Sequence, residues 1–347
     1  MNNQKSIIMK KTCTQETRRQ FIKTSTAAAA FSIVPLHVLG GTGFVAPSEK
    51  AKMDQKDNNF LEKRIGFLAA LDFAKWEPEK VISVLSNLGY SGVSWTLSHF
   101  NPRTKTKKQL QELVEITHRS GMEISEIIVQ QDLVNLDETV RKDRLKLVME
   151  SIEICSELGV GPVNLFTGPA PWNAKAPIIG ENIKEGEAWD FVFSAFDEIV
   201  PYAEKHKVEL AVEGVWGMLC HDYYSTRPLI EHYDSEYLGV NLDPSHGILY
   251  GNLDVGWIVK QWGKKIKHVH LKDCVGVRDN FLFPILGEGL VDWSDFFSAL
   301  QAIGYKGFCS VEFESFTYYR NVMKRNPEEA AQVSMNAIKR LLNWQKD

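Results

Sequence analysis

The second half of the chain carries four consecutive β-type segments that end in oxygen or imidazole donors. The first ends in VEG, the second in NLDPSH, the third reads HVHLKD, and the last ends in VEFE. Side chains two positions apart in a strand point to the same face, so the histidines of HVH share a face, as do the glutamates of EFE. The candidate chemical groups are Glu213, Asp243, His246, His268, His270, Lys272, Glu312 and Glu314.

Each of these donors alone has an ordinary structural explanation. A glutamate at a strand end is about as often an ion-pair partner as a ligand, and the aspartate of DPSH could form an Asx turn beside an incidental histidine. Four donors in succession are harder to explain by packing, because carboxylates are rarely buried without a partner. Together they predict a metal site. Carboxylates mixed with histidine favour Mn²⁺, Mg²⁺ or Co²⁺ over structural zinc, whose closed sites prefer thiolates.

Alternating β-type and helical segments predict the scaffold for these donors. Eight β-rich runs recur at the spacing of βα repeats. The helical patterns between them include one opened by an N-capping Asp137 and one with Pro327 in its first turn. We therefore expect a (β/α)8 TIM barrel over residues 63–347, with the donors at the carboxyl ends of its strands. The runs are 64–71, 91–97, 123–130, 161–168, 208–214, 237–243, 266–273 and 307–314.

Other features of the sequence limit which folds, cofactors and partners are expected. A doubly wound open sheet stays open as a fold, because alternation alone does not show closure. The first β-rich run continues as GFLAALDFAKW without a GxGxxG motif, so no nicotinamide or flavin site is expected. A net charge of -4 argues against a nucleic-acid binder, which needs clustered lysine and arginine. No apolar run reaches the ~20 residues of a membrane-spanning helix.

Residues 1–46 have the pattern of a twin-arginine export signal. TRRQFIK, at positions 17–23, precedes an alanine-rich, weakly apolar stretch. The alternative is an amphipathic helix that packs on the domain. Residues 47–62 are polar and are expected to form a linker. We expect a periplasmic protein, anchored in the membrane if the signal is retained. The four cysteines beyond the leader are scattered and are expected to be small buried residues, with one disulfide left open as an alternative.

The motifs LAVEGVW, GVNLDPSHGILYGNLD, IKHVHLKD, GEGLVDW and GFCSVEFE resemble those of the xylose-isomerase-like TIM barrels, also called sugar phosphate isomerases/epimerases. The resemblance is strong over the last four strands, and the first half shares only the βα rhythm. It implies that one divalent metal is bound by Glu213, Asp243, His270 and Glu312, with Glu314 as the alternative to Glu312.

The same resemblance implies two substrate contacts, and this chain differs from one group of the family at two positions. It places His246 against a substrate oxygen and Lys272 near the substrate. Ketose 3-epimerases of this family have a second glutamate after the first ligand and an arginine after the metal histidine, whereas this chain has Leu219 and Gly276 there. A standard ketohexose epimerase pocket is therefore not expected.

The metal site indicates proton abstraction beside a carbonyl group. A metal chelated by a ketone and its adjacent hydroxyl makes the neighbouring C–H acidic, and Glu213 and Glu312 are the candidate bases. Trp216 is the expected sugar-stacking residue, while packing is the simpler interpretation of Trp95 and Tyr250.

Export favours an unphosphorylated sugar as substrate. The leader also resembles that of exported glucose-fructose-oxidoreductase-like dehydrogenases, which are associated with 3-keto sugars. The predicted reaction is removal of the C2 proton of a 3-keto-glycoside and elimination of its glycosidic substituent. A sugar 3-dehydrogenase is the expected functional partner.

Three alternatives stay open at this point. The chain could be a periplasmic sugar epimerase or isomerase, or a non-catalytic sugar-binding barrel. An endonuclease IV-type phosphodiesterase shares the architecture but needs a three-metal cluster, more histidines and a basic groove. The sugar, its leaving group and the oligomeric state are left open by the sequence.

Overall fold

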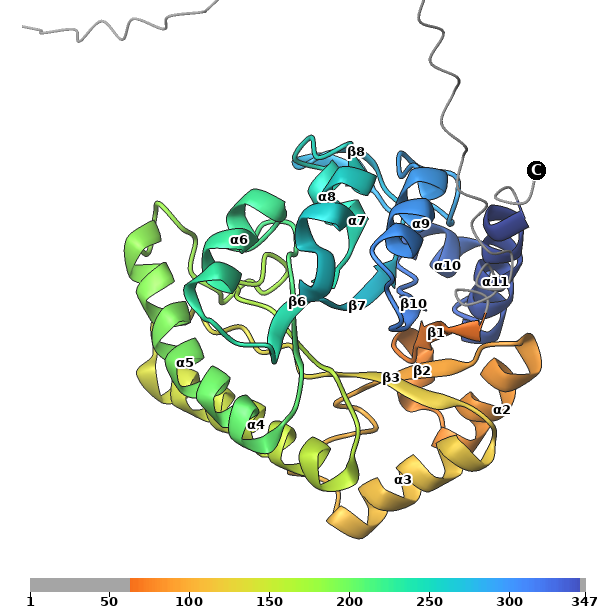
Figure 1. The fold of residues 1–347 in the computed structure, drawn as a ribbon, viewed down its shortest axis with the longest axis horizontal. Coiled ribbons are helices and arrows are strands. Elements are labelled where there is room, and N and C mark those ends of the chain that lie inside the picture. The colour runs from red at the N-terminus through yellow and green to blue at the C-terminus, as the bar shows by residue number, and fades with distance from the viewer. Residues whose placement is uncertain (1–62, 344–347) are drawn as a thin grey trace, which may run out of the picture. The chain divides into compact units, whose positions relative to one another are not determined.

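Residues 63–343 are described by a computed structural model, in which eight parallel strands form a closed barrel. The first and last barrel strands pair through Ile65 and Cys309, so the (β/α)8 prediction is confirmed and the open sheet is wrong. Figure 1 shows the strands surrounded by helices. The strands are β1 (Ile65–Leu68), β2 (Gly92–Thr96), β3 (Glu123–Ile128), β4 (Val163–Leu165), β5 (Leu210–Glu213), β6 (Leu238–Leu242), β7 (Ile266–Leu271) and β10 (Cys309–Val311).

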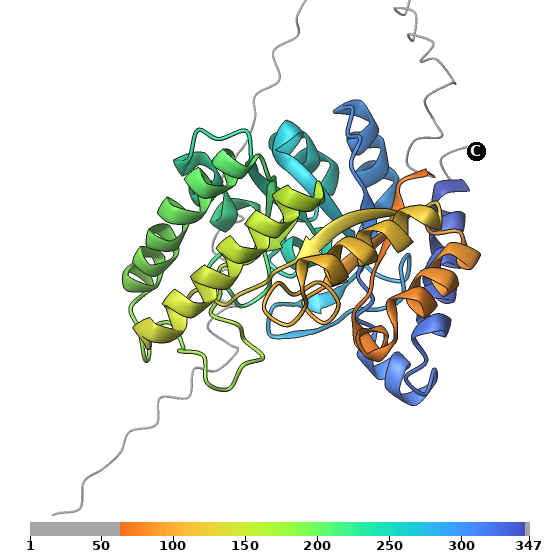
Figure 2. The ribbon, with the colours of Figure 1, turned by 90° about the horizontal axis from the view of Figure 1, so that it is seen from below.

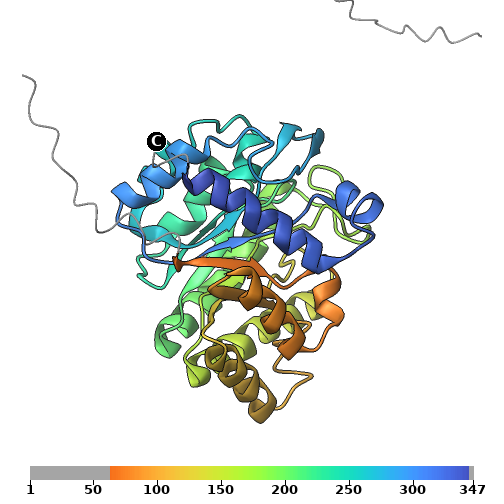
Figure 3. The same ribbon diagram turned by 90° about the vertical axis from the view of Figure 1, so that its right-hand side faces the viewer.

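Helices connect the strands and cover the outside of the barrel. In Figure 2, α4 and α5 run beside each other, and Figure 3 shows α11 lying across the barrel next to β1 and α2. The helices are α2 (Pro78–Leu88), α3 (Lys107–Arg119), α4 (Glu138–Leu158), α5 (Glu185–His206), α6 (Tyr223–His232), α7 (Pro244–Ile248), α8 (Val255–Trp262), α9 (Trp293–Ala302), α10 (Phe316–Asn321) and α11 (Pro327–Asn343), with 3-10 turns at Leu71–Lys75 and Gly263–Lys265.

Local sequence signals explain where several helices begin and end. The Asp137 side chain accepts a hydrogen bond from the Thr139 backbone N–H at the start of α4, as the N-cap prediction requires. Helix α11 begins at Pro327, where a missing N–H costs nothing. Helix α2 ends at Gly89, whose φ of 93° lies in the left-handed region that glycine adopts without steric penalty.

Two short elements at the carboxyl end of the barrel were not predicted. After β7 the chain forms an antiparallel hairpin of β8 (Val275–Val277) and β9 (Asn280–Leu282). After β10 it forms α10, a helix of six residues. Both elements follow strands that carry the candidate donors, and both contribute walls to the cleft described below.

A layer of hydroxyl groups lies inside the barrel below the donor residues. The Oγ atoms of Ser94 and Ser125 are 2.8 Å apart, and Ser310 Oγ lies 3.0 Å from each of them. Ser310 is two residues before Glu312, so the serine layer lies one step deeper in the barrel than the carboxylate. These buried hydroxyls satisfy one another, as buried polar groups must.

The predicted signal at 1–46 and the predicted linker at 47–62 lie outside the described residues. Within residues 63–343, no helix is both long and apolar enough to cross a membrane. Cys155, Cys220, Cys274 and Cys309 are all buried and free, which confirms their prediction as small buried residues.

Candidate metal and active site

Four neighbouring strands bring the predicted ligand set together at the carboxyl end of the barrel. Glu213 is the last residue of β5, Asp243 follows β6, His270 lies in β7, and Glu312 follows β10. These strands are neighbours in the order β10-β7-β6-β5. One ligand atom from each residue lies within 4.8 Å of the others, which is the spacing expected around a single cation.

Glu213 presents one oxygen to this centre and has the other held by amides. Its Oε2 accepts hydrogen bonds from Gln130 Nε2 at 2.7 Å and from the Nδ2 atoms of Asn164 and Asn241, each at 3.3 Å. Its Oε1 lies 3.2 Å from His270 Nδ1. The amide groups therefore fix the carboxylate so that Oε1 faces the other donors.

The two carboxylate oxygens of Asp243 also have different surroundings. Its Oδ1 accepts hydrogen bonds from the Ser245 backbone N–H at 2.8 Å and the Ser245 hydroxyl at 2.7 Å. Its Oδ2 makes no hydrogen bond of acceptable geometry and faces Lys272 Nζ at 2.9 Å. Burial raises the pKa of Asp243 to about 6, although the Lys272 ammonium opposes that shift.

A buried carboxylate orients His270 from the side away from the other ligands. His270 Nε2 lies 2.7 Å from Glu126 Oε1, while Nδ1 faces Glu213 and lies 3.5 Å from Glu312 Oε2. His268 Nε2 lies 3.0 Å from the same Glu126 oxygen. This carboxylate–histidine pairing directs Nδ1 towards the ligand set, as carboxylates behind metal-binding histidines commonly do.

The charges on the pair are consistent with that role. Burial would raise the pKa of Glu126, but His268 and His270 hold it well below its usual value, so the carboxylate is ionised. Burial would lower the pKa of His270, but Glu126, Glu213 and Glu312 outweigh it and raise that pKa. Glu126, His268 and His270 also form a compact donor group of their own. Because both imidazoles already contact the Glu126 carboxylate, we interpret this group as support for His270.

Lys272 lies among the acidic groups on the cleft side of the centre. Its Nζ contacts Glu312 Oε2 in a short ion pair, lies 3.1 Å from Glu314 Oε2, and donates to His246 Nε2 at 3.1 Å. Burial and the neighbouring Lys272 lower the pKa of His246 well below its usual value, so this imidazole is neutral and can accept that hydrogen bond. Burial raises the pKa of Glu314 to about 7.

These residues fit a divalent cation. Five carboxylates, from Glu126, Glu213, Asp243, Glu312 and Glu314, contact only two basic groups of the described residues at the centre, Lys272 and His270, and such an excess of buried negative charge is costly unless a cation balances it. The donors facing the centre are three carboxylate oxygens and one imidazole nitrogen, a hard set without thiolates. Glu312 belongs to this set, whereas Glu314 contacts Lys272 beside it.

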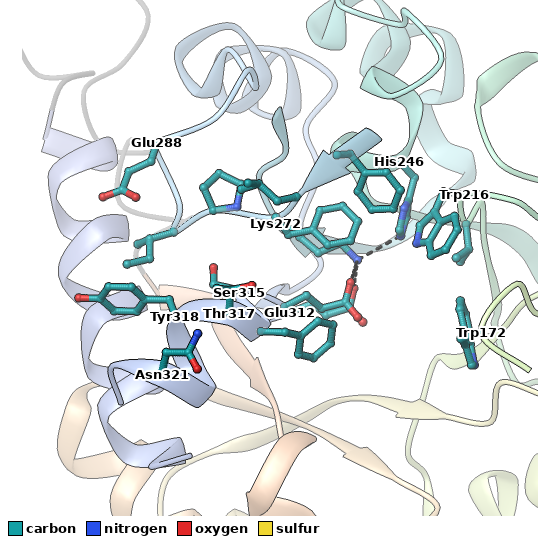
Figure 4. A pocket seen from close by; sticks show the side chains of 18 of the residues that line it. Trp172, Trp216, His246, Lys272, Glu288, Glu312, Ser315, Thr317, Tyr318 and Asn321 are labelled. Atoms are coloured by element: carbon teal, nitrogen blue, oxygen red, sulfur yellow. Dashed lines mark hydrogen bonds and ion pairs between the residues drawn. The ribbon is translucent and has the colours of Figure 1, made fainter. Parts of the chain in front are cut away.

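A cleft of about 990 Å³ opens above the centre, and its walls come from the β8–β9 hairpin, α10 and the loops after β4 and β5. Figure 4 shows Lys272, Glu312 and His246 in its middle, with Trp172 and Trp216 on one side. The two indole rings are 6.3 Å apart. His246, Lys272 and Trp216 thus lie where the sequence analysis expected substrate contacts, and these roles stay predictions.

The other residues singled out from the sequence lie away from this cleft. Trp95 is fully buried in the core, and Tyr250 stacks on His221 with ring centroids 4.1 Å apart, in agreement with packing roles. Leu219 is buried, and Gly276 lies in β8 with a φ of 104°. Neither Leu219 nor Gly276 is among the described residues that line the cleft, so the structure offers no substitute epimerase contact at these positions.

The residues that hold the candidate ligands in place were not predicted from the sequence. Glu126, Gln130 and Asn164 come from β3, the loop after it and β4, strands that had no obvious donor at their ends. Only Glu126 carried a usable signal, because a glutamate inside the otherwise apolar run SEIIV requires a buried partner.

Asp273 binds backbone and side-chain N–H groups of the GEGLVDW motif, which gives this motif a structural role. Its buried carboxylate accepts hydrogen bonds from five N–H groups and so ties the cleft wall at 284–291 to the end of β7. The donors are the backbone N–H groups of Cys274, Gly287, Gly289 and Val291 and the indole N–H of Trp293. A methyl group on Gly289 would lie 2.0 Å from Asp273 Oδ1, so only glycine allows this approach.

Several known proteins resemble this chain in sequence or in fold. A family model described as xylose isomerase-like TIM barrel matches residues 82–341. Inosose dehydratase of Geobacillus thermodenitrificans is 26% identical over 155 residues, which cover 40% of this chain and half (50%) of that protein.

Two solved structures illustrate the shared fold. The IolI protein with a bound zinc atom matches with a TM-score of 0.65 and 20% identity, covering 81% of this chain and 99% of that chain. The 3-keto-D-glucoside 4-epimerase from E. coli matches with a TM-score of 0.63 and 14% identity, covering 80% of this chain and 98% of that chain.

Proposed function

This chain belongs to the xylose isomerase-like TIM barrel family, and from that premise we propose that it is a metal-dependent lyase acting on an unphosphorylated 3-keto-glycoside. The observation that carries the proposal is the site itself. Two ionisable carboxylates, Glu213 and Glu312, contact the same His270 nitrogen at the base of an open cleft, and a lysine lies beside them. That arrangement suits removal of a proton next to a carbonyl group.

Glu213, Asp243, His270 and Glu312 would hold the cation, and we propose Mn²⁺, with Mg²⁺ or Co²⁺ as alternatives. When bound, such an ion polarises a carbonyl oxygen and stabilises the negative charge that develops as the C–H bond breaks. The remaining steps fall to side chains. Glu312 or Glu213 takes the C2 proton, and the C1–O bond breaks as the C1=C2 bond forms. The departing oxygen receives a proton, and the Lys272 ammonium in the cleft lining is the donor we assign to this step.

Two findings support elimination over epimerisation. The ketose 3-epimerase positions are occupied by Leu219 and Gly276, which lie outside the cleft lining among the described residues. A relative also carries the name dehydratase, which denotes an elimination. The choice of a 3-keto-glycoside as substrate is supported separately, because a protein of the same fold is named for a 3-keto-glucoside. A sugar epimerase or isomerase is the second candidate, because the same proton abstraction followed by return of the proton gives an epimer or an isomer, and solved structures with this fold include epimerases.

We also propose that the substrate carries no phosphate and is met outside the cytoplasm. Of the described residues that line the cleft, Lys272 is the only lysine or arginine, and it already contacts three carboxylates. A phosphate group would need several donors that the lining does not offer. The twin-arginine pattern at 17–23 agrees with periplasmic chemistry, in which a sugar 3-dehydrogenase would supply the keto group.

The test is an elimination assay on purified, Mn²⁺-loaded full-length protein with a 3-keto-glucoside. We expect release of the aglycone together with an unsaturated 3-keto sugar. Glu213→Gln and Glu312→Gln should each lower turnover by about 10²- to 10⁴-fold, the usual effect of a positioned base. Glu231→Gln, an exposed change on α6, serves as the matched control.

Two outcomes would contradict the proposal. If the 3-keto-glucoside is stable while free ketoses epimerise, the chain is an epimerase. If neither reaction occurs and both glutamine variants keep full affinity for the sugar, the chain is a sugar-binding protein.

A further inference from the structure

The cleft extends beyond the candidate metal site in two directions. Figure 4 shows Trp172 and Trp216 on one side of Lys272 and Glu312, and Tyr318, Asn321 and Glu288 well away on the other side. All of these residues line one continuous space of about 990 Å³. This is the upper end of the roughly 300–1,000 Å³ typical of small-molecule sites, and a single sugar ring would leave much of it to water.

Several side chains that line the cleft, besides the tryptophans, are apolar and exposed. We call this group the outer arm and define it by six cleft-lining side chains from β9, the loop after it, α10 and the residue that follows α10. Leu282 is 57% exposed, Tyr318 is 42% exposed and Val322 is 52% exposed, although each is large and apolar or aromatic. Contiguous apolar surface of this kind beside a polar centre usually marks a binding site. The outer arm consists of Leu282, Pro284, Ile285, Phe316, Tyr318 and Val322.

The outer arm is held in a defined position. Its β9 and loop residues precede the segment that Asp273 anchors through the backbone N–H groups of Gly287 and Gly289, each at 3.0 Å. Its α10 residues follow directly after Glu312 and Glu314, so this wall starts at the candidate metal site. The outer arm and the candidate metal site therefore border the same cleft.

The charge of the residues at the outer arm limits which chemical groups can bind there. Glu288 lines the far end, and the described lining there includes no lysine or arginine. An anionic group such as a phosphate or a uronate would be repelled, whereas a neutral apolar group would cover the exposed side chains. The polar groups of Asn321 and Tyr318 lie near that end, where they can bond a hydroxyl on such a group.

We propose that the outer arm binds an uncharged, apolar or aromatic aglycone, while the sugar ring lies towards Trp216. This inference rests on the proposed function, because it names the substrate class of the same site. The substrate is then a 3-keto-glycoside of an apolar alcohol or phenol. In the reaction the C2 proton passes to a carboxylate, the C1–O bond breaks, C1=C2 forms, and the released oxygen is protonated to give the free alcohol and an unsaturated keto sugar.

Binding of unreactive glucosides tests the arm separately from catalysis. Mn²⁺-loaded full-length protein would be titrated by calorimetry with methyl, 2-phenylethyl and glucosyl glucosides (the last a disaccharide), in both anomeric forms. We expect 2-phenylethyl glucoside to bind roughly tenfold or more tightly than methyl glucoside, because burial of the added apolar surface favours it. Leu282→Ala and Tyr318→Ala should each reduce that ratio by about threefold or more. The matched controls are Leu253→Ala and Tyr224→Ala, whose residues are similarly exposed but do not line the cleft.

Elimination from methyl and 2-phenylethyl 3-keto-glucosides is measured in parallel, since these two alkoxides have similar leaving ability. A larger kcat/KM for the phenylethyl compound, carried by a lower KM, supports the outer arm. Equal binding of the methyl and phenylethyl glucosides overturns it, as does tighter binding of the disaccharide. If phenylethyl glucoside binds as expected but neither 3-keto-glucoside reacts, the proposed lyase function fails while the apolar subsite stands.

Discussion

Replacing Glu126 tests whether a residue that cannot itself reach the substrate controls the metal site. Glu126 is fully buried, accepts a hydrogen bond from His270 at 2.7 Å and lies 3.0 Å from His268 Nε2. In Glu126→Gln the negative charge is lost, and the amide can accept through only one atom. The substitution keeps the size of the side chain, so it removes the charge-assisted hydrogen bond without leaving a cavity.

The expected loss of metal affinity in Glu126→Gln follows from these contacts. Loss of a carboxylate behind a metal-binding histidine typically weakens metal binding by about 10- to 100-fold. That range corresponds to about 1.4–2.8 kcal/mol, since each factor of ten is about 1.4 kcal/mol. The positioning role predicts that added Mn²⁺ restores much of the turnover, because the four ligands themselves are intact.

Mn²⁺ affinity is measured by calorimetry or by competition with a chelator, and thermal unfolding of the metal-free protein is followed alongside. Glu123→Gln is the matched control, because it makes the same change in the same strand at an exposed residue that pairs with Arg64. A Glu126→Gln protein that is folded and binds Mn²⁺ as tightly as the control would refute the positioning role. A loss of turnover that excess Mn²⁺ does not restore would also contradict it.

Three further changes have defined outcomes. Asp273→Asn should destabilise the protein by about 1–3 kcal/mol in urea unfolding, because an amide nitrogen cannot accept the N–H groups that the second carboxylate oxygen binds; unchanged stability would contradict the anchoring role. Trp216→Ala should raise KM more than it lowers kcat in steady-state kinetics, whereas an unchanged KM would remove Trp216 from the binding site. Asp72 has its pKa lowered to about 2, chiefly by a hydrogen bond from Lys75, so its ionised form stabilises the fold above pH ~4 and this stabilisation is lost as the pH falls towards 2. In urea unfolding, Asp72→Asn should therefore be less stable than the parent protein at pH 7 and equally stable near pH 2. The same difference in unfolding free energy at both pH values would contradict a stabilising role for ionised Asp72.

The strands, several helix ends and the four candidate metal ligands could be recognised from the sequence by itself. Strand and helix patterns arise from residues close together in the chain, so Asp137 and Gly89 could be recognised as helix ends before any fold was known. The ligands could be found for a related reason. Parallel strands in a barrel all end at the same rim, so donors at consecutive strand ends must converge.

The tertiary structure alone decided closure, the support of the ligands and the shape of the cleft. The pairing of β1 with β10 joins the two ends of the domain, and no local pattern reports it. Glu126 and His270 are 144 positions apart, and their contact depends on how β3 and β7 are placed around the ring. The outer arm likewise combines side chains from β9 and α10, short elements whose position is set by Asp273 and by the end of β10. Such contacts depend on long-range packing, and residues that meet only there leave no pattern in the local sequence.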